Sequence, residues 1–410
     1  MINVLINAYA VSPNWGSEQG MGWNWVINLA KYCHLDVITE GEWKAEIDDA
    51  VKKLPQRDNL TFHYLPVADK VRKMCWNQGD WRFYWHYEKW QRRALGKARE
   101  ICASKHIDIL HQLNMIGFRE PGYLWKIEDI PFVWGPVGGM ELMPMPYLKG
   151  APLKQRLFNR LKNIINEYQY RHSVRVKAAI ERSSFVISAV KGVQDVLKQL
   201  YNKDSILINE TGVEINPDVV KRKSEPNSPL KIIWVGKFDF RKQLPIALRS
   251  VSAMNKRDVE LHICGTGSET VTADMKRIAE TGGIQSQCYW HGNVDHDKIL
   301  GMMADSDLMF FTSIMEATST VVLEAISAGL LVLCFDTCGF GPIVKGFAGR
   351  TVEISEPNQS VKDFATVLNQ FYQDRNLLNN ISDDIMSNRE ALTWDAKAQR
   401  TVEIYNSILK

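Results

Sequence analysis

The amino-acid sequence predicts an α/β protein built from two Rossmann-like domains that face a central cleft. Three observations predict this fold. The chain has 410 residues, which is more than one hydrophobic core usually supports. Short β-branched segments alternate with helical patterns, as is typical of parallel sheets with helical crossovers. The alternation stops at a proline-rich polar segment near the midpoint, residues 216–229, and then starts again.

The strands are expected where short apolar segments lie between helical patterns. In the first domain we expect them at residues 3–7, 35–39, 60–65, 107–111, 132–134 and 185–188. In the second domain we expect them at residues 231–235, 260–263, 288–290, 308–311 and 331–335. The expected domains are residues 1–215 and 216–392, followed by a last helix at 393–410. Open α/β sheets bind ligands beyond the carboxyl ends of their strands, so the chemistry is expected in the loops that follow strands.

The composition is that of an ordinary globular protein. Hydrophobic residues make up 45% and charged residues 24%, which argues against disorder or a fibrous repeat. The first seven residues are expected to form a strand and not a secretory signal, and no apolar stretch has the roughly 18 residues of a membrane span. The seven cysteines include no CxxC pair, as expected for reduced thiols. These features predict a cytoplasmic protein.

The net charge of +3 hides a difference between the two halves of the chain. Residues 1–200 contain 28 Lys/Arg and 20 Asp/Glu, whereas the remaining residues contain 22 and 27. Two segments, residues 70–99 and 149–182, concentrate the basic excess, and each holds nine basic and two acidic residues together with aromatic side chains.

Basic segments of this kind suit an anionic membrane, and we expect peripheral contact through 70–99 and 149–182 on the inner face of the cell membrane. The alternative is a pair of ordinary amphipathic helices with a solvated basic face and a core-facing aromatic face. A nucleic acid is not expected as a partner, because the segments lack a recognisable reading motif and the second half of the chain is acidic.

Two glutamates lie in and just after the loop that follows the fourth expected strand of the second domain. Glu316 precedes a helix, Glu324 lies about one turn into it, and Thr318, Ser319 or Thr320 can cap its first turn. Free N–H groups and the positive end of the helix dipole would stabilise a diphosphate there, and carboxylates accept hydrogen bonds from sugar hydroxyls. By spacing alone, a cap region followed by a solvated helix face is the alternative.

Three motifs lie in the surrounding stretch, residues 289–344: His291-Gly292-Asn293-Val294, Ala304-Asp305-Ser306-Asp307 and Leu323-Glu324-Ala325-Ile326-Ser327-Ala328-Gly329 followed by Val332. In order and spacing they resemble the signature region of family 4 glycosyltransferases (glycosyl transferases group 1), which have the GT-B fold. The resemblance implies that Glu316 contacts the donor sugar and that Glu324 binds the nucleotide ribose. The family commonly has Gly-Phe-Gly after the first glutamate, whereas this sequence has Ala317-Thr318-Ser319, which leaves the donor open.

A glycine and two lysines follow the first strand of the second domain. Gly236 permits close approach of a phosphate, and Lys237 and Lys242 supply positive charge for it. The family carries a basic pair here that neutralises the leaving diphosphate, so the resemblance implies this role for both lysines. Gln243 stands where the family has a glycine. Taken alone, the loop also fits an ordinary exposed basic turn.

Three further positions are candidates. Gly16 lies where the family has a glycine-rich loop that faces the donor phosphates and the acceptor, and a simple strand-to-helix turn is the alternative. His111 resembles a family histidine that contacts the donor sugar, and a histidine bonded to backbone is the alternative. Gly265 resembles the family's loop near the nucleobase, and residues 394–408 resemble its last helix, which returns to the first domain.

The resemblance implies a retaining, metal-independent glycosyltransferase that moves a sugar from a UDP- or GDP-sugar to a glycan or lipid-linked acceptor. The expected process is synthesis of a bacterial surface polysaccharide, namely exopolysaccharide, capsule or lipopolysaccharide. No cofactor or metal is expected, because no Asp-x-Asp pair stands in a metal-friendly setting and no His/Cys cluster has zinc spacing. The alternatives are a nucleotide-sugar epimerase of similar fold and a non-catalytic nucleotide-sugar-binding protein.

Overall fold

The computed structural model describes residues 1–77, 79–219, 221–317 and 319–410. The chain forms two compact units. The first unit comprises Met1–Met140, Ile165–Thr211 and Trp394–Lys410, and the second comprises Glu141–Ile164 and Gly212–Thr393. The second unit thus includes residues 141–164, which the sequence-based division assigns to the first domain. Tyr147 shows the physical reason, because it is buried and its hydroxyl donates to Ser360 Oγ at 2.8 Å.

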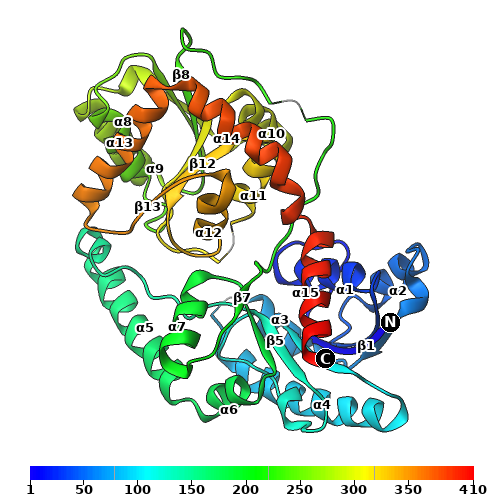
Figure 1. The fold of residues 1–410 in the computed structure, drawn as a ribbon. Helices are drawn as coiled ribbons and strands as arrows, with labels where there is room; N and C mark the ends of the chain where they lie inside the picture. Colours follow the sequence, from blue (N-terminus) through cyan, green and yellow to red (C-terminus); the bar gives the residue numbers. More distant parts are fainter. Residues whose placement is uncertain (78, 220, 318) are drawn as a thin grey trace. The chain divides into compact units, whose positions relative to one another are not determined.

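The first unit contains a seven-stranded parallel sheet in the order β3-β2-β1-β4-β5-β6-β7. Its strands are β1 (Ile2–Ala8), β2 (Cys33–Thr39), β3 (Leu60–Tyr64), β4 (Ile109–Asn114), β5 (Phe132–Val137), β6 (Phe185–Ser188) and β7 (Ile206–Leu207). Its helices are α1 (Ser17–Leu29), α2 (Lys44–Lys52), α3 (Asp69–Trp76), α4 (Arg82–Ser104), α6 (Val174–Arg182), α7 (Lys191–Tyr201) and α15 (Trp394–Leu409). Helix α5 (Leu153–His172) begins in the second unit and ends in the first (Figure 1).

Helices pack on the first sheet through two apolar cores. One core joins helices α1 and α15, which lie side by side in Figure 1, through residues such as Leu29 and Tyr405. The other core joins α4, α6 and α7 through residues such as Trp90, Ile180 and Leu197. The last helix of the chain is therefore an integral part of the first unit's core.

The second unit contains a six-stranded parallel sheet in the order β10-β9-β8-β11-β12-β13. Its strands are β8 (Leu230–Val235), β9 (Val259–Cys264), β10 (Cys288–Gly292), β11 (Leu308–Phe311), β12 (Leu331–Phe335) and β13 (Gly349–Val352). Its helices are α8 (Leu244–Ala253), α9 (Glu269–Thr281), α10 (His296–Asp305), α11 (Thr320–Ser327), α12 (Gly341–Ile343), α13 (Pro357–Gln373) and α14 (Arg375–Asn388). The strand order reverses between β8 and β11, and such a reversal is where open α/β sheets bind ligands.

Every strand that the sequence predicts is present, and the α/β class with two parallel sheets is confirmed. Two strands were not predicted, β7 and β13, and both lie at the edge of a sheet. Strand β7 has only two residues, and the GRTV sequence of β13 lacks an apolar run, so their pairing depends on the neighbouring strand. None of the helices in the described ranges is both long and apolar enough to cross a membrane.

The aromatic core of the second unit gives a test of its packing. Phe310 of β11 is fully buried, and its ring centroid lies 5.0 Å from that of Phe364 in α13. Phe310→Ala should lower the free energy of unfolding by about 3–5 kcal/mol, because the surrounding core closes only partly over the cavity. Denaturant unfolding measures this, and Phe310→Leu, which keeps most of the volume, should cost about 1 kcal/mol. Equal losses from the two variants would contradict the assignment of Phe310 to a tightly packed core.

Candidate functional site

The loops after β8 and β11 meet beside the strand-order reversal of the second sheet. Lys242 Nζ lies 2.8 Å from Glu316 Oε1, and the two side chains are only 14% and 15% exposed. Because water is largely excluded from this pair, the attraction between the charges is stronger than at an open surface. Two residues predicted for the site are therefore in direct contact.

Three neighbours contact Glu316, two of them through its carboxylate and one through its backbone N–H. Ser313 Oγ donates to Glu316 Oε1 at 2.8 Å, and the backbone N–H of Glu316 donates to Cys338 Sγ at 3.1 Å. Burial raises the pKa of the Cys338 thiol well above its ordinary value, so the sulfur is a neutral acceptor. Arg241 places a second cation 3.9 Å from Glu316 Oε2. Sequence reasoning did not single out these neighbours, although an arginine directly before a candidate lysine is a readable signal.

A set of backbone contacts positions Lys242. Its N–H donates to Asp239 Oδ1 at 3.1 Å, and its carbonyl accepts a hydrogen bond from Thr312 Oγ1 at 2.8 Å. The ammonium also lies 4.9 Å from the ring centroid of Phe311, a cation–π distance. Lys237, the other predicted lysine, is exposed to solvent. The structure therefore brings Lys242 and Arg241 to Glu316.

Glu324 lies in helix α11 and has a partner that the sequence did not reveal. His296 Nε2 is 3.2 Å from Glu324 Oε1, and the Glu324 side chain is 27% exposed. Ser319 occupies the N-cap position of α11 without a side-chain capping bond, and Thr320 is the first helical residue. Thr318, the third predicted cap residue, lies outside the described residues.

Two of the predicted glycines, Gly236 and Gly265, lie where the loops after β8 and β9 come very close together. Gly265 has φ +151°, and a Cβ at this position would lie 1.8 Å from the carbonyl oxygen of Gly236. A Cβ at Gly236 would in turn meet the Lys242 side chain at 3.3 Å. The loops after β8 and β9 can approach each other this closely only because Gly265 lacks a side chain, whereas a side chain at Gly236 would crowd Lys242.

The predicted residues of the first unit have two different surroundings. Gly16 is the exposed N-cap of α1, with φ −84° and open space where a Cβ would stand, so the fold itself does not require glycine there. His111 is fully buried: its Nε2–H donates to the Gly135 carbonyl at 2.6 Å, and its Nδ1 accepts a hydrogen bond from the Tyr405 hydroxyl. Contact of His111 with a donor sugar stays a prediction, and this geometry favours a structural histidine.

Comparisons with known proteins bear on the family of the second unit. Residues 217–385 match the family model for Glycosyl transferases group 1. Most of the second unit thus matches a group 1 glycosyltransferase domain. The phosphatidylinositol N-acetylglucosaminyltransferase GPI3 subunit of Saccharomyces cerevisiae (strain YJM789) is 24% identical over 197 residues, which cover 47% of this chain and 41% of that protein. The chain thus matches about two fifths of the length of this relative.

Solved structures share the fold along nearly the whole chain. The lipopolysaccharide outer core galactosyltransferase WaaB is 14% identical with a TM-score of 0.56, and the match covers 98% of this chain and 99% of WaaB. HepE from Anabaena, solved in complex with UDP, is 13% identical with a TM-score of 0.56, and the match covers 99% and 100%. The fold is therefore the GT-B fold of glycosyltransferases.

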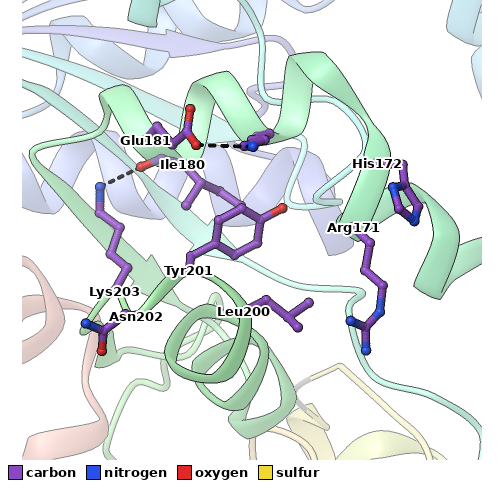
Figure 2. Close-up of a pocket in the computed structure, with 9 residues that line it drawn as sticks. Arg171, His172, Ile180, Glu181, Leu200, Tyr201, Asn202 and Lys203 are labelled. Carbon is purple, nitrogen blue, oxygen red and sulfur yellow. Dashed lines mark hydrogen bonds and ion pairs between the residues drawn. The ribbon is translucent and has the colours of Figure 1, made fainter.

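Two cavities lie outside the Lys242–Glu316 contact. A cavity of about 430 Å³ in the group 1 domain borders the loop after β8 and is lined in part by Phe238, Asp239 and Phe240. A second, open cavity of about 710 Å³ lies in the first unit among α5, α6 and α7 (Figure 2). None of the predicted site residues lines this second cavity. Among the residues that the structure describes, no three His, Cys, Asp or Glu side chains are grouped closely enough to hold a metal ion.

The contact between Gly265 and Gly236 predicts which glycine the fold requires. Gly265→Ala should lower the free energy of unfolding by at least about 2 kcal/mol, because the new Cβ has both an unfavourable φ and a backbone oxygen in its place. Gly16→Ala is the matched control, since its Cβ meets open space and its stability should be nearly unchanged. Thermal or urea unfolding of the two variants checks this, and a harmless Gly265→Ala would refute the close approach.

The burial of His111 predicts a pH-dependent stability. Burial lowers the pKa of His111 from 6.5 to about 4. Between pH 4 and pH 6.5 His111 is therefore protonated to a greater extent in the unfolded chain than in the folded protein. The contribution of the neutral, buried His111 to the free energy of unfolding is complete above pH 6.5 and decreases towards pH 4. The decrease should reach on the order of 3 kcal/mol, measured by urea unfolding across this range. His111→Asn should remove this part of the pH dependence, whereas substitution of the exposed His34 should preserve it.

Proposed function

We propose that the protein transfers a sugar from a nucleoside-diphosphate sugar to a glycan or lipid-linked acceptor, with retention of the anomeric configuration and without a metal ion. The Lys242–Glu316 ion pair carries the proposal. It lies at the strand-order reversal of a group 1 glycosyltransferase domain, where ligands of such sheets bind. Its charges suit a donor that has both a diphosphate and sugar hydroxyls.

The proposed roles follow from the chemistry of each side chain. Lys242, assisted by Arg241 and Lys237, neutralises the diphosphate, and the N-terminus of α11 adds its positive dipole. Glu316 accepts hydrogen bonds from the donor sugar, and Glu324 accepts them from the ribose. In the free protein Glu316 satisfies Lys242, so the arriving diphosphate replaces a carboxylate as the partner of this lysine.

The reaction breaks the bond between the anomeric carbon and the diphosphate oxygen, and the electron pair stays on that oxygen. Lys242 stabilises the charge that develops there, which is the main electrostatic contribution of this side chain to catalysis. The acceptor hydroxyl forms the new bond to the anomeric carbon from the face that the diphosphate leaves. Its proton passes to the departing phosphate, so the products are the glycoside and the nucleoside diphosphate.

A UDP-sugar is the proposed donor, ahead of a GDP-sugar, because HepE, which shares this fold, is solved with UDP. The proposed acceptor is a glycan or a lipid-linked oligosaccharide of a surface polysaccharide. The names of two similar proteins support this class, one a lipopolysaccharide galactosyltransferase and the other a phosphatidylinositol N-acetylglucosaminyltransferase subunit. With such an acceptor, the enzyme works in the cytoplasm at the inner face of the cell membrane.

The donor site is tested by binding and turnover together. UDP at a hundred times its dissociation constant should add about 2.7 kcal/mol to the stability of the wild-type protein. Lys242→Ala should weaken the stabilisation by UDP. It should also lower the rate of sugar transfer about 10²- to 10³-fold in buffer that contains EDTA, because the departing diphosphate loses the cation that stabilises its negative charge. NMR of the product reports the anomeric configuration.

Lys276→Ala is the matched control, because Lys276 is an exposed lysine of α9 in the same unit. It should leave both UDP stabilisation and transfer near the wild-type values. If no nucleoside diphosphate stabilises the wild-type protein, the donor site is refuted. Interconversion of nucleotide sugars without any acceptor would instead identify an epimerase.

A further inference from the structure

Helix α5 has its polar and apolar faces reversed relative to an ordinary surface helix. Its protein-facing side carries Asn159, Asn163 and Asn166, which are 7%, 9% and 3% exposed, and near its end Tyr170, which packs in the core of the first unit. The side chain of Asn163 bonds both the N–H and the carbonyl of Met143, and that of Asn166 bonds Arg119. The buried polar groups are thus matched by specific partners, as burial requires.

The opposite side of α5 presents a continuous apolar surface to solvent. At about 100° per residue, its large apolar side chains occupy an arc of roughly 140° centred opposite the buried asparagines. This α5 apolar face consists of Leu153, Leu157, Phe158, Leu161, Ile164, Ile165 and Tyr168, each exposed by between 44% and 79%. An exposed patch of this kind on a single face marks a surface that meets an apolar partner.

Positive charge borders the α5 apolar face. Arg160 and Arg171 fall at one edge of the arc, Lys162 at the other, and Lys154 near its N-terminal end. Long basic side chains in such positions can keep their charges in water while their carbon chains extend along an apolar layer. Helix α4, in the other basic segment, buries Phe83, Tyr87 and Trp90 in the core and exposes Tyr84 and Trp85 near its start.

The open cavity of Figure 2 continues the surface at the C-terminal end of α5. Arg171 and His172 of α5 line it together with Lys177 and Lys203, and Ile180, Leu200 and Tyr201 form its apolar part. Its cations outnumber its single carboxylate, Glu181, which lies 3.8 Å from Lys177 Nζ. The Lys203 ammonium is held by the carbonyls of Ile180, at 2.5 Å, and Ser183. A basic cavity with an apolar floor suits the charged headgroup of an amphiphile.

We propose that α5 lies in the plane of an anionic lipid bilayer, with its apolar face in the interfacial layer and the basic cavity against an anionic headgroup. Charge complementarity favours this partner over a second copy of the chain. Residues 149–182 hold nine basic and two acidic residues, so two copies packed through α5 would bring like charges together. The contact itself is inferred from the exposed apolar side chains and the charge of α5. Only its purpose, access to a lipid-linked acceptor, rests on the proposed function.

The test is co-sedimentation of the full-length protein with vesicles of phosphatidylcholine, with or without phosphatidylglycerol. Wild type should bind the phosphatidylglycerol vesicles. The triple variant Leu161→Gln/Ile164→Gln/Tyr168→Gln should bind at least about tenfold more weakly, because most of the favourable free energy of transferring these side chains into the apolar layer is lost. The matched control Trp81→Gln/Tyr84→Gln/Trp85→Gln removes three exposed aromatic side chains from the start of α4 and should bind like wild type.

The electrostatic part is tested separately. Arg160→Gln, Lys162→Gln and Arg171→Gln should each weaken binding about fivefold, and added salt should reduce the difference between these variants and wild type. Arg92→Gln, Arg93→Gln and Lys97→Gln on α4 are the matched controls and should have little effect. Wild type that ignores anionic vesicles, or α5 variants that bind as well as wild type, would overturn the proposal.

Two further measurements separate the remaining outcomes. A wild-type dimer that the α5 apolar-face variant converts to monomer, without vesicle binding, would show that a second copy covers this face. Stabilisation by UDP should be the same in the α5 variants and in wild type, which also shows that the variants fold. If UDP fails to stabilise any of them while vesicle binding still depends on α5, the proposed function fails and the membrane contact stands.

Discussion

The largely buried ion pair between Lys242 and Glu316 is the contact on which the proposed chemistry of the second unit depends. Each partner follows a different strand, β8 or β11, and parallel pairing brings these strand ends to the same edge of the sheet. Truncating one partner would leave the other charged with little water around it, which is costly. Hydrogen bonds order the two loops that carry the pair. Asp239 accepts a bond from the Lys242 N–H, Ser313 donates to the Glu316 carboxylate, and the Glu316 N–H donates to Cys338.

This arrangement keeps the lysine neutralised and positioned before a donor arrives. Because backbone contacts position Lys242 independently of Glu316, a diphosphate that replaces the Glu316 carboxylate would meet a lysine whose backbone is already in place. Gly265 contributes to the same geometry, because its lack of a side chain allows the loop after β9 to approach the backbone of Gly236. Binding and catalysis in the proposed reaction would thus draw on a site whose geometry exists in the free protein.

The two basic segments of the first half differ in a way that matters for function. Both hold the same balance of charges, and both form amphipathic helices. Helix α4 buries its aromatic side chains in the core of the first unit, whereas α5 buries asparagines and exposes leucine, isoleucine and phenylalanine. Apolar surface that is left in water costs free energy, so the exposed apolar face of α5 calls for a partner.

The sequence by itself determined the two parallel sheets, because strand and helix periodicities are local, and its resemblance to a known family made Lys242 and Glu316, which follow recognisable strands, candidates for the site. It left open whether His111 meets a ligand. Only the tertiary structure pairs this side chain with Gly135 and with Tyr405, which is 294 residues away. Periodicity likewise reveals that α5 has two unlike faces but not which one faces the protein. That orientation was decided by contacts such as Arg119 with Asn166, because long-range hydrogen bonds leave no periodic signal in the chain.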